Sequence, residues 1–488
     1  FNVSQSLPTS PDLSMSNQTG LTIPLTLPSL QKGYQQGTVT PVDVIKSILT
    51  DLAHRGDDGI WTYTLPEQTL IERATALMQM SASQRSQLPL WGIPFSIKDC
   101  IDLAGHPTSA ACPAFTYNAI HTNPAVQKLL DAGAILIGKT NLDQFATGLV
   151  GIRTGYTAPH NAFSKDHISG GSSSGAALSV AAGLVSFAIG TDTGGSGRVP
   201  AGFNNVVGLK PTRGLLSTRH TVEACRTLDC LSIFALTATD AHTVMKLAQG
   251  YDPINPFSRS ANFPPAHLSS YQAKQAFRFG VPRPNQQEFF GNTDVATRYE
   301  NAIKTLTDLG GTRMDVDYSL FLEANDLLFN GPWVAERYVS VGAFVEANPE
   351  AVFPITREIL LKAKEITAAQ TFEGLYAVET LKQTMQTLWH QVDCLVVPTA
   401  GTIYRIDEIE AEPLTLNSNL GYYTNFVNLL DLSAIAIPNG FQSNGIPTGI
   451  TFIAPPHSEN YLVGLGSTFH HASNAPLGAT PFRLAMAS

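Results

Sequence analysis

Residues 168–214 decide the fold: ISGGSSSGAALSVAAGLVSFAIGTDTGGSGRVPAGFNNVVGLKPTRG. Two glycine-serine turns, residues 169–175 and 191–197, enclose an apolar segment without a charged residue. Glycines let the backbone adopt positive φ angles and approach a ligand closely, and successive amide N–H groups in such turns form an anion-binding nest. A serine beside that nest is placed to attack a carbonyl group whose oxyanion the nest would hold.

Other interpretations of these turns stay open at this point. Serines in a glycine-rich turn before a helix are often only N-caps, and composition alone favours that structural role. A phosphate-binding loop is not expected, and a dinucleotide-binding Gly-x-Gly-x-x-Gly does not occur in the segment. The nucleophile elbow Gly-x-Ser-x-Gly is matched only in part around Ser196.

A serine needs a base to become a nucleophile, and no histidine lies in either turn. Lys98 is a candidate, because it follows the apolar run of residues 91–97 and would lie at a buried strand end. Desolvation lowers the pKa of a lysine and can make it a base. The alternative is a structural lysine paired with Asp99 or Asp102, and the residues alone leave both interpretations open.

Composition excludes several classes of protein. Charged residues make up 14% of the 488, against about 25% in an average globular chain, and 30 Lys and Arg against 39 Asp and Glu give a net charge of −9. An acidic chain without a basic run is not expected to bind nucleic acid. No apolar run reaches the roughly 18 residues of a membrane span, so no membrane partner is expected.

The five cysteines are scattered, with no Cys-x-x-Cys pair and no histidine cluster at zinc spacing. This pattern argues against a disulfide framework and against a metal site, and reduced thiols favour a cytoplasmic setting. The cysteines are at positions 100, 112, 225, 230 and 394.

Hydrophobic periodicity predicts an α/β fold with a mixed or parallel sheet. A helix is expected to begin after the cap Thr40, and another to span residues 293–309, where two glycines stop it. Residues 139–143 should form a strand-to-helix turn with Asn141 near the cap. Strands are expected at residues 91–99, 134–138, 277–281, 394–397 and 449–453. Residues 1–24 are interpreted as a lead-in and 25–488 as a single domain.

Together these motifs resemble the signature of the amidase signature family. That pattern is Gly-Gly-Ser-Ser-x-Gly, matched at residues 170–175, then Gly-x-Asp-x-Gly-Gly-Ser-x-Arg-x-Pro, matched at residues 190–200. Upstream, Gly-Ile-Pro-Phe-Ser-Ile-Lys-Asp at 92–99 and Gly-Lys-Thr-Asn-Leu-Asp at 138–143 also match. The resemblance implies one α/β/α sandwich domain around a central mixed, mainly parallel sheet, and neither a metal nor a cofactor.

The same resemblance implies a Ser–cis-Ser–Lys mechanism. Ser196 would be the nucleophile, Lys98 the base, and Ser172, preceded by a cis peptide bond, the bridge between them. Asp192 and Arg198 are expected to be scaffold. The oxyanion hole would be formed by the backbone N–H groups of Thr193, Gly194, Gly195 and Ser196.

Two further segments resemble allophanate hydrolases, a branch of this family: residues 224–234 and 327–337. The resemblance implies that Arg337 binds the substrate carboxylate, because a guanidinium can pair with a carboxylate through two parallel hydrogen bonds. The alternative is a surface arginine paired with Glu336 or Glu323. The branch typically has a tyrosine at the position of Phe329, so a donor is lost there.

Tyr338 could replace that donor, or the preferred substrate could be a related urea derivative. Ser173 is also expected to line the substrate pocket. The predicted function is hydrolysis of allophanate with ammonia release through an acyl-enzyme, in urea degradation. Alternatives are another amidase acting on small amides and a glutamine-deamidating amidotransferase subunit.

We further expect a homodimer and a functional link to urea carboxylase. Bacterial and yeast allophanate hydrolases often carry a C-terminal accessory domain, and we do not expect these 488 residues to include one.

Overall fold

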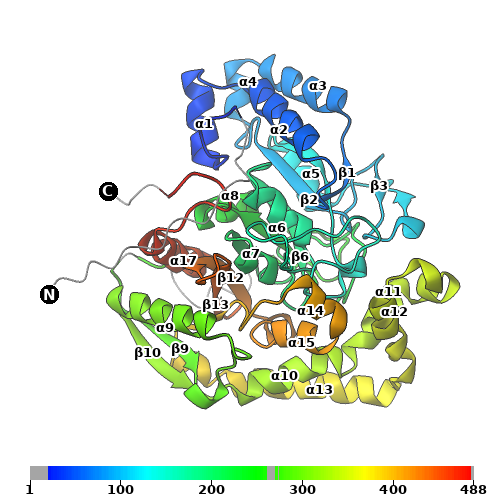
Figure 1. The fold of residues 1–488 in the computed structure, drawn as a ribbon, viewed down its shortest axis with the longest axis vertical. Helices are drawn as coiled ribbons and strands as arrows, with labels where there is room; N and C mark the ends of the chain where they lie inside the picture. The colour runs from blue at the N-terminus through cyan, green and yellow to red at the C-terminus, as the bar shows by residue number, and fades with distance from the viewer. Residues whose placement is uncertain (1–19, 261–269, 273, 485–488) are drawn as a thin grey trace.

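The computed structural model describes residues 20–260, 270–272 and 274–484, so most of the expected lead-in lies outside the described residues. Its centre is an 11-stranded sheet in the order β1-β5-β2-β6-β8-β7-β12-β13-β11-β9-β10 (Figure 1). The strands are β1 (Trp61–Thr64), β2 (Pro94–Lys98), β5 (Ile135–Thr140), β6 (Phe187–Asp192), β7 (Val207–Lys210), β8 (Cys230–Ala235), β9 (Phe277–Pro282), β10 (Gly311–Val316), β11 (Cys394–Pro398), β12 (Ser433–Phe441) and β13 (Pro447–Ala454).

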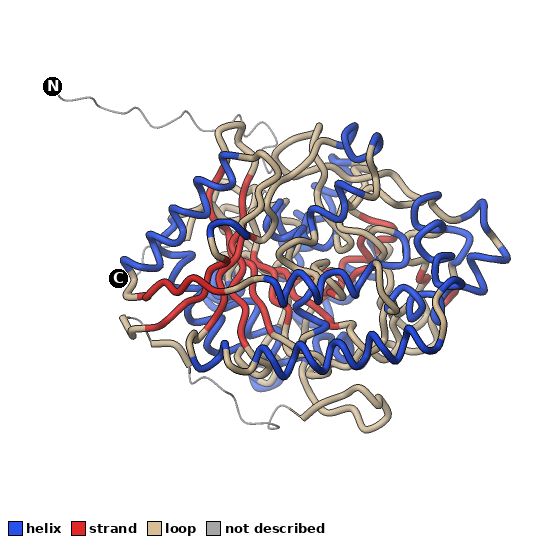
Figure 2. Tube along the Cα trace, turned by 90° about the horizontal axis from the view of Figure 1, so that it is seen from below, coloured by secondary structure: helices blue, strands red, loops and turns tan. Residues whose placement is uncertain are grey.

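Helices cover both faces of this sheet, which Figure 2 shows as a central band of strands between helical layers. The α-helices are α1 (Leu27–Gln36), α2 (Pro41–Arg55), α3 (Glu67–Met78), α4 (Ala82–Ser86), α5 (Pro124–Asp131), α6 (Ser174–Ala181), α7 (Val199–Phe203), α8 (Ala238–Ala248), α9 (Thr293–Asp308), α10 (Ser319–Phe329), α11 (Trp333–Ala347), α12 (Pro354–Leu361), α13 (Ala368–Met385), α14 (Ile406–Ala411), α15 (Thr415–Leu420), α16 (Phe426–Leu429) and α17 (Glu459–Ser473). A small second sheet pairs β3 (Pro107–Thr108) with β4 (Tyr117–Asn118).

The expected α/β architecture around a mixed sheet is confirmed. Strands β5, β2 and β6 pair in parallel on one flank, and β11, β9 and β10 do so on the other. Between them, neighbours from β6 to β11 run antiparallel. Parallel pairing is therefore a property of the two flanks, and the catalytic-motif strands β2 and β6 lie together on one of them.

Local signals placed several elements correctly. Thr40 caps α2 in a capping box with Asp43, and α9 begins and ends within one residue of the expected range. Gly310 follows α9 with φ 99°, the left-handed conformation expected after a helix. The predicted strands correspond to β2, β5, β9, β11 and β13.

The expected helix after residues 139–143 is wrong. Only a 3-10 turn, η2 (Gln144–Ala146), follows Asp143. The Asp143 carboxylate accepts hydrogen bonds from the N–H groups of Val150, Gly151 and Arg153, which folds the chain into a loop instead.

Asn141 is likewise no helix cap. Its side-chain amide donates to the carbonyl oxygens of Gly59 and Thr157, at 2.9 Å and 3.0 Å.

Residues 133–140 do fit the spacing Gly-x-x-x-x-Gly-Lys-Thr of a phosphate-binding loop. The spacing alone is misleading, because the spacer residues form the buried strand β5 instead of an open loop. Lys139 is itself buried and pairs with Asp99, at 3.0 Å between Nζ and Oδ1. This segment is therefore a strand of the core, and its lysine serves an internal ion pair.

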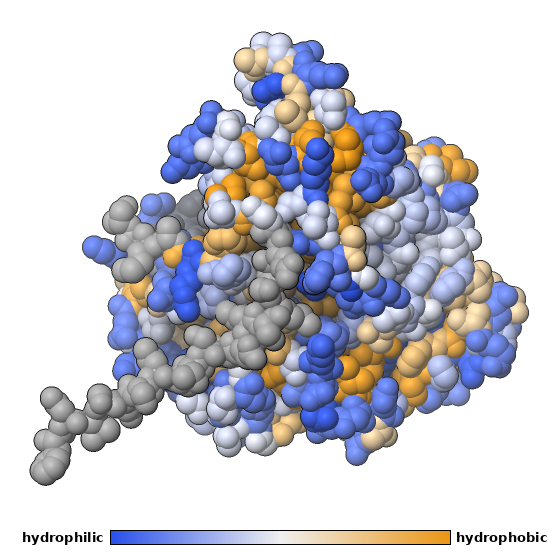
Figure 3. Space-filling model, turned by 45° about the horizontal axis from the view of Figure 1, so that its top comes forward, coloured by the Kyte–Doolittle hydropathy of each residue, from blue (hydrophilic) through white to orange (hydrophobic). Residues whose placement is uncertain are grey.

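The central strands lie in the core, and for that reason their apolar runs are not interrupted by exposed polar residues. Every residue of β2, β5 and β6 is buried, as expected of strands covered on both faces. Helix α6 is also buried on all sides. The five cysteines are all buried and none forms a disulfide. The outer face in Figure 3 is a mosaic in which apolar side chains gather in patches between polar ones.

Candidate active site

Lys98 ends β2 inside the protein and is fully buried. Its Nζ lies 2.7 Å from Ser172 Oγ and 2.7 Å from Thr191 Oγ1. Burial lowers the pKa of the Lys98 amine below its ordinary value, although Cys100 and Asp143 act in the opposite direction. A buried amine between two hydroxyl groups, with a lowered pKa, is suited to accept a proton.

The alternative interpretation of Lys98 does not hold in the structure. Asp99 forms its ion pair with Lys139 from the neighbouring strand. Asp102 accepts a hydrogen bond from the Thr108 hydroxyl at 2.8 Å. Neither carboxylate pairs with Lys98.

Ser172 follows a cis peptide bond between Gly171 and Ser172, in the conformation that the family resemblance implied. The N–H of Asp143 donates to the Ser172 carbonyl oxygen at 3.1 Å, and that of Gly171 donates to Leu149 at 2.9 Å. A Cβ atom on Gly171 would lie 2.2 Å from Asp143 Oδ2, so only glycine fits at this point. The loop therefore fixes the Ser172 hydroxyl against Lys98.

The neighbouring serines hold the loop. The Ser173 hydroxyl donates to the Thr191 carbonyl oxygen at 3.0 Å and accepts from the Thr191 N–H at 3.3 Å. Ser174 Oγ donates to the Asn141 carbonyl oxygen. Because both bonds of Ser173 go to the main chain of β6, this side chain joins the two glycine-serine turns.

Ser196 lies on the second turn, between β6 and α7, and is 4% exposed. Among the residues that the structure describes, its hydroxyl group forms no hydrogen bond. The turn itself is anchored by a buried ion pair in which Arg198 Nε and Nη2 contact the two oxygens of Asp192, at 2.9 Å and 3.0 Å. Burial alone would raise the pKa of Asp192, but the Arg198 charge outweighs it and holds that pKa below its ordinary value.

Asp192 also uses two of the backbone N–H groups of the turn. Gly195 donates to Oδ1 and Gly197 donates to Oδ2, each at 3.0 Å. The prediction that Gly195 donates to an oxyanion therefore needs correction, since its N–H already has an acceptor. Within the described chain, three neighbouring N–H groups form no hydrogen bond, those of Thr193, Gly194 and Ser196.

Residues 224–234 form hydrogen bonds with this turn. Asp229 accepts hydrogen bonds from Thr193 Oγ1 at 2.5 Å and from the N–H groups of Ala224 and Cys225. Burial raises the pKa of the Asp229 carboxyl group. The segment that distinguished one branch of the family thus contacts the turn that carries Ser196.

Arg337 is buried in α11, 3% exposed. Its Nη1 donates to the Ala146 carbonyl oxygen at 3.2 Å and to Thr147 Oγ1 at 3.0 Å, and its buried Nε has no partner among the described residues. Glu336 instead accepts from Thr227, and Glu323 is exposed. Arg337 is therefore no surface arginine, and part of its guanidinium is available to a ligand.

Phe329 ends α10 beside this arginine, with the Arg337 guanidinium carbon 5.4 Å from the ring centroid. Tyr338 does not replace the absent tyrosine hydroxyl. Its own hydroxyl lies near the Glu346 carboxylate, eight residues further along α11, and this carboxylate raises the pKa of Tyr338.

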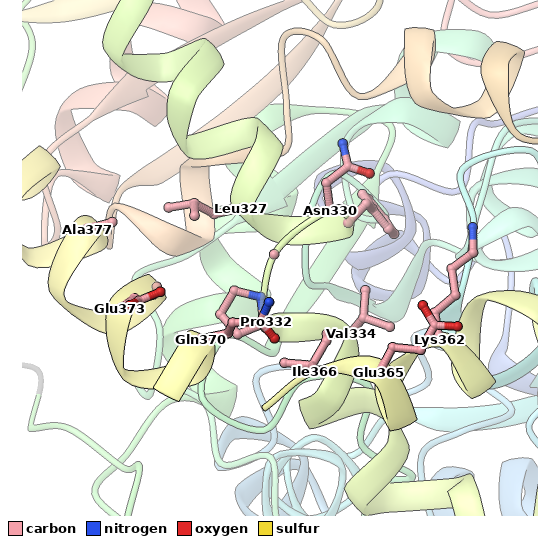
Figure 4. Close-up of a pocket in the computed structure, with 13 residues that line it drawn as sticks. Leu327, Asn330, Pro332, Val334, Lys362, Glu365, Ile366, Gln370, Glu373 and Ala377 are labelled. Atoms are coloured by element: carbon pink, nitrogen blue, oxygen red, sulfur yellow. The ribbon is translucent and has the colours of Figure 1, made fainter. Parts of the chain in front are cut away.

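Phe329 and Asn330 lie on the rim of two cavities. One, of about 600 Å³, lies between the residues following α10 and the segment from η5 (Lys362–Glu365) to α13 (Figure 4). The other, of about 210 Å³, lies between α10 and the α15–α16 connection. Neither cavity is lined by Lys98, Ser172 or Ser196.

Sequence reasoning missed Thr191, whose hydroxyl oxygen lies 2.7 Å from Lys98 Nζ. Thr191 precedes Asp192 in the same motif, so its position could have suggested contact with the base. In the described ranges no group of three or more His, Cys, Asp or Glu side chains could hold a metal ion. No helix in those ranges combines the length and hydropathy required to cross a membrane.

The sequence of the chain is similar to those of two known proteins. It is 40% identical over 415 residues to the urea amidolyase of Saccharomyces cerevisiae, covering 84% of this chain and 22% of that protein. It is 30% identical over 465 residues to a glutamyl-tRNA(Gln) amidotransferase subunit from an Exiguobacterium species, covering 90% of this chain and 95% of the relative.

The solved Kluyveromyces lactis allophanate hydrolase has a TM-score of 0.87 and 36% sequence identity, covering 94% of this chain and 75% of that chain. The chain spans only 22% and 24% of the lengths of two urea amidolyases that it matches. The Amidase family model matches residues 50–463, well over half of the sequence, and so the chain belongs to the amidase family.

Proposed function

We propose that this chain hydrolyses allophanate, the N-carboxylated form of urea, and releases ammonia from its terminal amide. The observation that carries the proposal is the buried Arg337, whose guanidinium has no carboxylate partner among the described residues. A buried, fixed cation is what recognition of a small planar carboxylate requires. The similarity to the Kluyveromyces lactis allophanate hydrolase supports the same substrate.

The reaction would begin with attack of Ser196 Oγ on the terminal amide carbon. The proton passes from Ser196 through the Ser172 hydroxyl to the uncharged amine of Lys98, and returns to the leaving nitrogen, so ammonia departs. The Lys98–Ser172 hydrogen bond supports the second half of this relay. The Ser172–Ser196 half is part of the proposal, as catalytic hydrogen bonds often tighten only with substrate bound.

The developing oxyanion would be held by the backbone N–H groups that Asp192 leaves free, those of Thr193, Gly194 and Ser196. Water then attacks the acyl-enzyme ester by the same proton route in reverse. The product is N-carboxycarbamate, which can lose carbon dioxide. Phe329 would flank the substrate by contact with its planar face, without the hydrogen bond that a tyrosine hydroxyl supplies.

The carboxylate-binding step predicts a selective effect of Arg337→Ala. Truncating one partner of a buried charge pair costs about 2–5 kcal/mol, so kcat/KM for allophanate should fall by roughly 30-fold to several thousandfold. Hydrolysis of a neutral amide such as biuret should change little. Steady-state ammonia release on both substrates measures this.

The matched control is Arg283→Ala, which removes an exposed arginine paired with Asp317 and should leave both activities unchanged. Equal losses on the charged and neutral substrates in Arg337→Ala would contradict the carboxylate assignment.

The base role of Lys98 predicts a pH dependence. Because burial lowers the Lys98 pKa and only the uncharged amine accepts a proton, kcat/KM should fall as pH drops through that pKa. The unfolded chain, with an ordinary lysine, binds the proton over a wider range, so the Lys98 contribution to the free energy of unfolding rises with pH between the two pKa values. A pH profile of kcat/KM that stays flat on the acid side would contradict this role.

A second candidate function is deamidation of glutamine for a partner enzyme. It is favoured by the similarity to the glutamyl-tRNA(Gln) amidotransferase relative, which extends over nearly the whole of both chains. Ammonia release from glutamine, measured beside allophanate, malonamide and biuret, decides between the two. A general amidase of this family would instead favour the neutral amides.

We also propose that the chain works as a homodimer in the cytoplasm, supplied by a urea-carboxylating enzyme. Carboxylation of urea is the reaction that makes allophanate, and the similarity to urea amidolyase supports that link. Five buried, unbridged cysteines fit a reducing compartment. Exposed apolar side chains on α11 and α13, among them Val339, Phe372 and Tyr376, could provide a contact between copies.

A further inference from the structure

Asn425 contains a buried polar atom that the reaction described above does not use. The residue immediately precedes α16 and is 6% exposed. Its Oδ1 is buried and accepts no hydrogen bond from the described residues. Most buried side-chain carbonyl oxygens are hydrogen-bonded in native proteins, so this one is free to accept a hydrogen bond from a ligand.

The position of Asn425 relative to the turn that carries Ser196 is fixed. Thr424 Oγ1 donates to the Gly194 carbonyl oxygen at 2.7 Å, and Arg198 Nη1 donates to the Thr424 carbonyl oxygen at 3.1 Å. A Cβ atom on Gly194 would lie 3.3 Å from Asn425 Oδ1, and one on Gly421 would lie 2.6 Å from it. The amide oxygen therefore lies near both glycines, and the N–H of Gly194 is one of the three free donors.

The same residue lines the cavity of about 210 Å³ together with Phe329. Phe329 in turn contacts Arg337, with 5.4 Å between its ring centroid and the guanidinium carbon. Asn425 is thus close to the turn that would form the oxyanion hole, and it shares a cavity with Phe329, which lies beside the proposed carboxylate site.

Allophanate presents one N–H group in this interval. With its reacting carbonyl group at Ser196 and its carboxylate at Arg337, as proposed above, the nitrogen that joins them would lie between these two groups. We infer that Asn425 Oδ1 accepts a hydrogen bond from this central N–H and selects substrates that carry one. The inference rests on the proposed function. It adds a residue that recognises the N–H group by which a urea derivative differs from its carbon analogue.

The test compares allophanate with malonamate, in which a CH₂ group replaces the central N–H. In the Asn425→Ala protein, only allophanate loses a hydrogen bond, so the ratio of kcat/KM for allophanate to that for malonamate should fall by about 10-fold to 100-fold. Asn425→Leu, of similar volume and without an acceptor, should give the same change. Labelling of Ser196 by a fluorophosphonate verifies that both variants keep an intact site.

The matched control is Asn330→Ala, at the rim of the same cavity, where the exposed amide donates to the Asp326 carboxylate. It should leave the ratio unchanged. If the unaltered protein hydrolyses allophanate but the ratio is unchanged in both Asn425 variants, this inference alone is overturned. No ammonia from allophanate with the unaltered protein would overturn the proposed function, and this inference with it.

Discussion

Ser196→Ala is expected to lower ammonia release from allophanate on the order of a millionfold, the loss typical when the nucleophile of a hydroxyl-based hydrolase is removed. The fold should be unaffected, because the Ser196 hydroxyl forms no hydrogen bond among the described residues. Single-turnover and steady-state ammonia assays, with thermal unfolding beside them, measure both expectations.

Ser186→Ala is the matched control, since this hydroxyl is buried in the same motif region and has no hydrogen-bond partner among the residues that the structure describes. Its activity and melting temperature should both stay near those of the unaltered protein. If Ser196→Ala kept more than a tenth of the activity, another residue would have to be the nucleophile.

Lys98→Met should have the second-largest effect. Removing a general base costs about 10²–10⁴-fold in rate, and the acid limb of the pH profile should disappear with it. The Ser172 and Thr191 hydroxyls lose their shared partner, so some loss of stability, about 1–3 kcal/mol for each stranded group, is expected too.

The comparison variant is Lys362→Met, which removes an exposed lysine paired with Glu358 and should change neither the rate nor the pH profile. A Lys98→Met protein with a normal rate and an intact acid limb would show that the amine is not the base.

The sequence predicted those parts of the molecule that local pattern determines. The Gly-Ser turns, the buried strand that ends in Lys98 and the capped helix at Thr40 each follow from a few adjacent residues. Pairing across the sheet does not follow from them, because β6 pairs with β8 and β12 with β7 through contacts between distant segments. The antiparallel centre was therefore not foreseen.

The site divides in the same way. Lys98, Ser172 and Ser196 could be named because their spacing in the chain is distinctive. The hydrogen bond from the Gly195 N–H to Asp192 depends on the three-dimensional course of the turn, which composition cannot reveal. Asn425 and Gly194 are distant in the sequence, and only folding brings them close together.

Lys98, the last residue of β2, and Asp99, the residue that follows it, contact different partners. Because alternate side chains leave a strand on opposite faces, Lys98 faces Ser172 and Thr191 while Asp99 faces Lys139. A single-residue deletion in this strand would bring the Asp99 carboxylate to the position of the amine, and a single-residue insertion would bring the Ile97 side chain there. Length variation along this lineage should therefore spare β2 and accumulate in outer connections, and a chain found with a shifted β2 should be an inactive one.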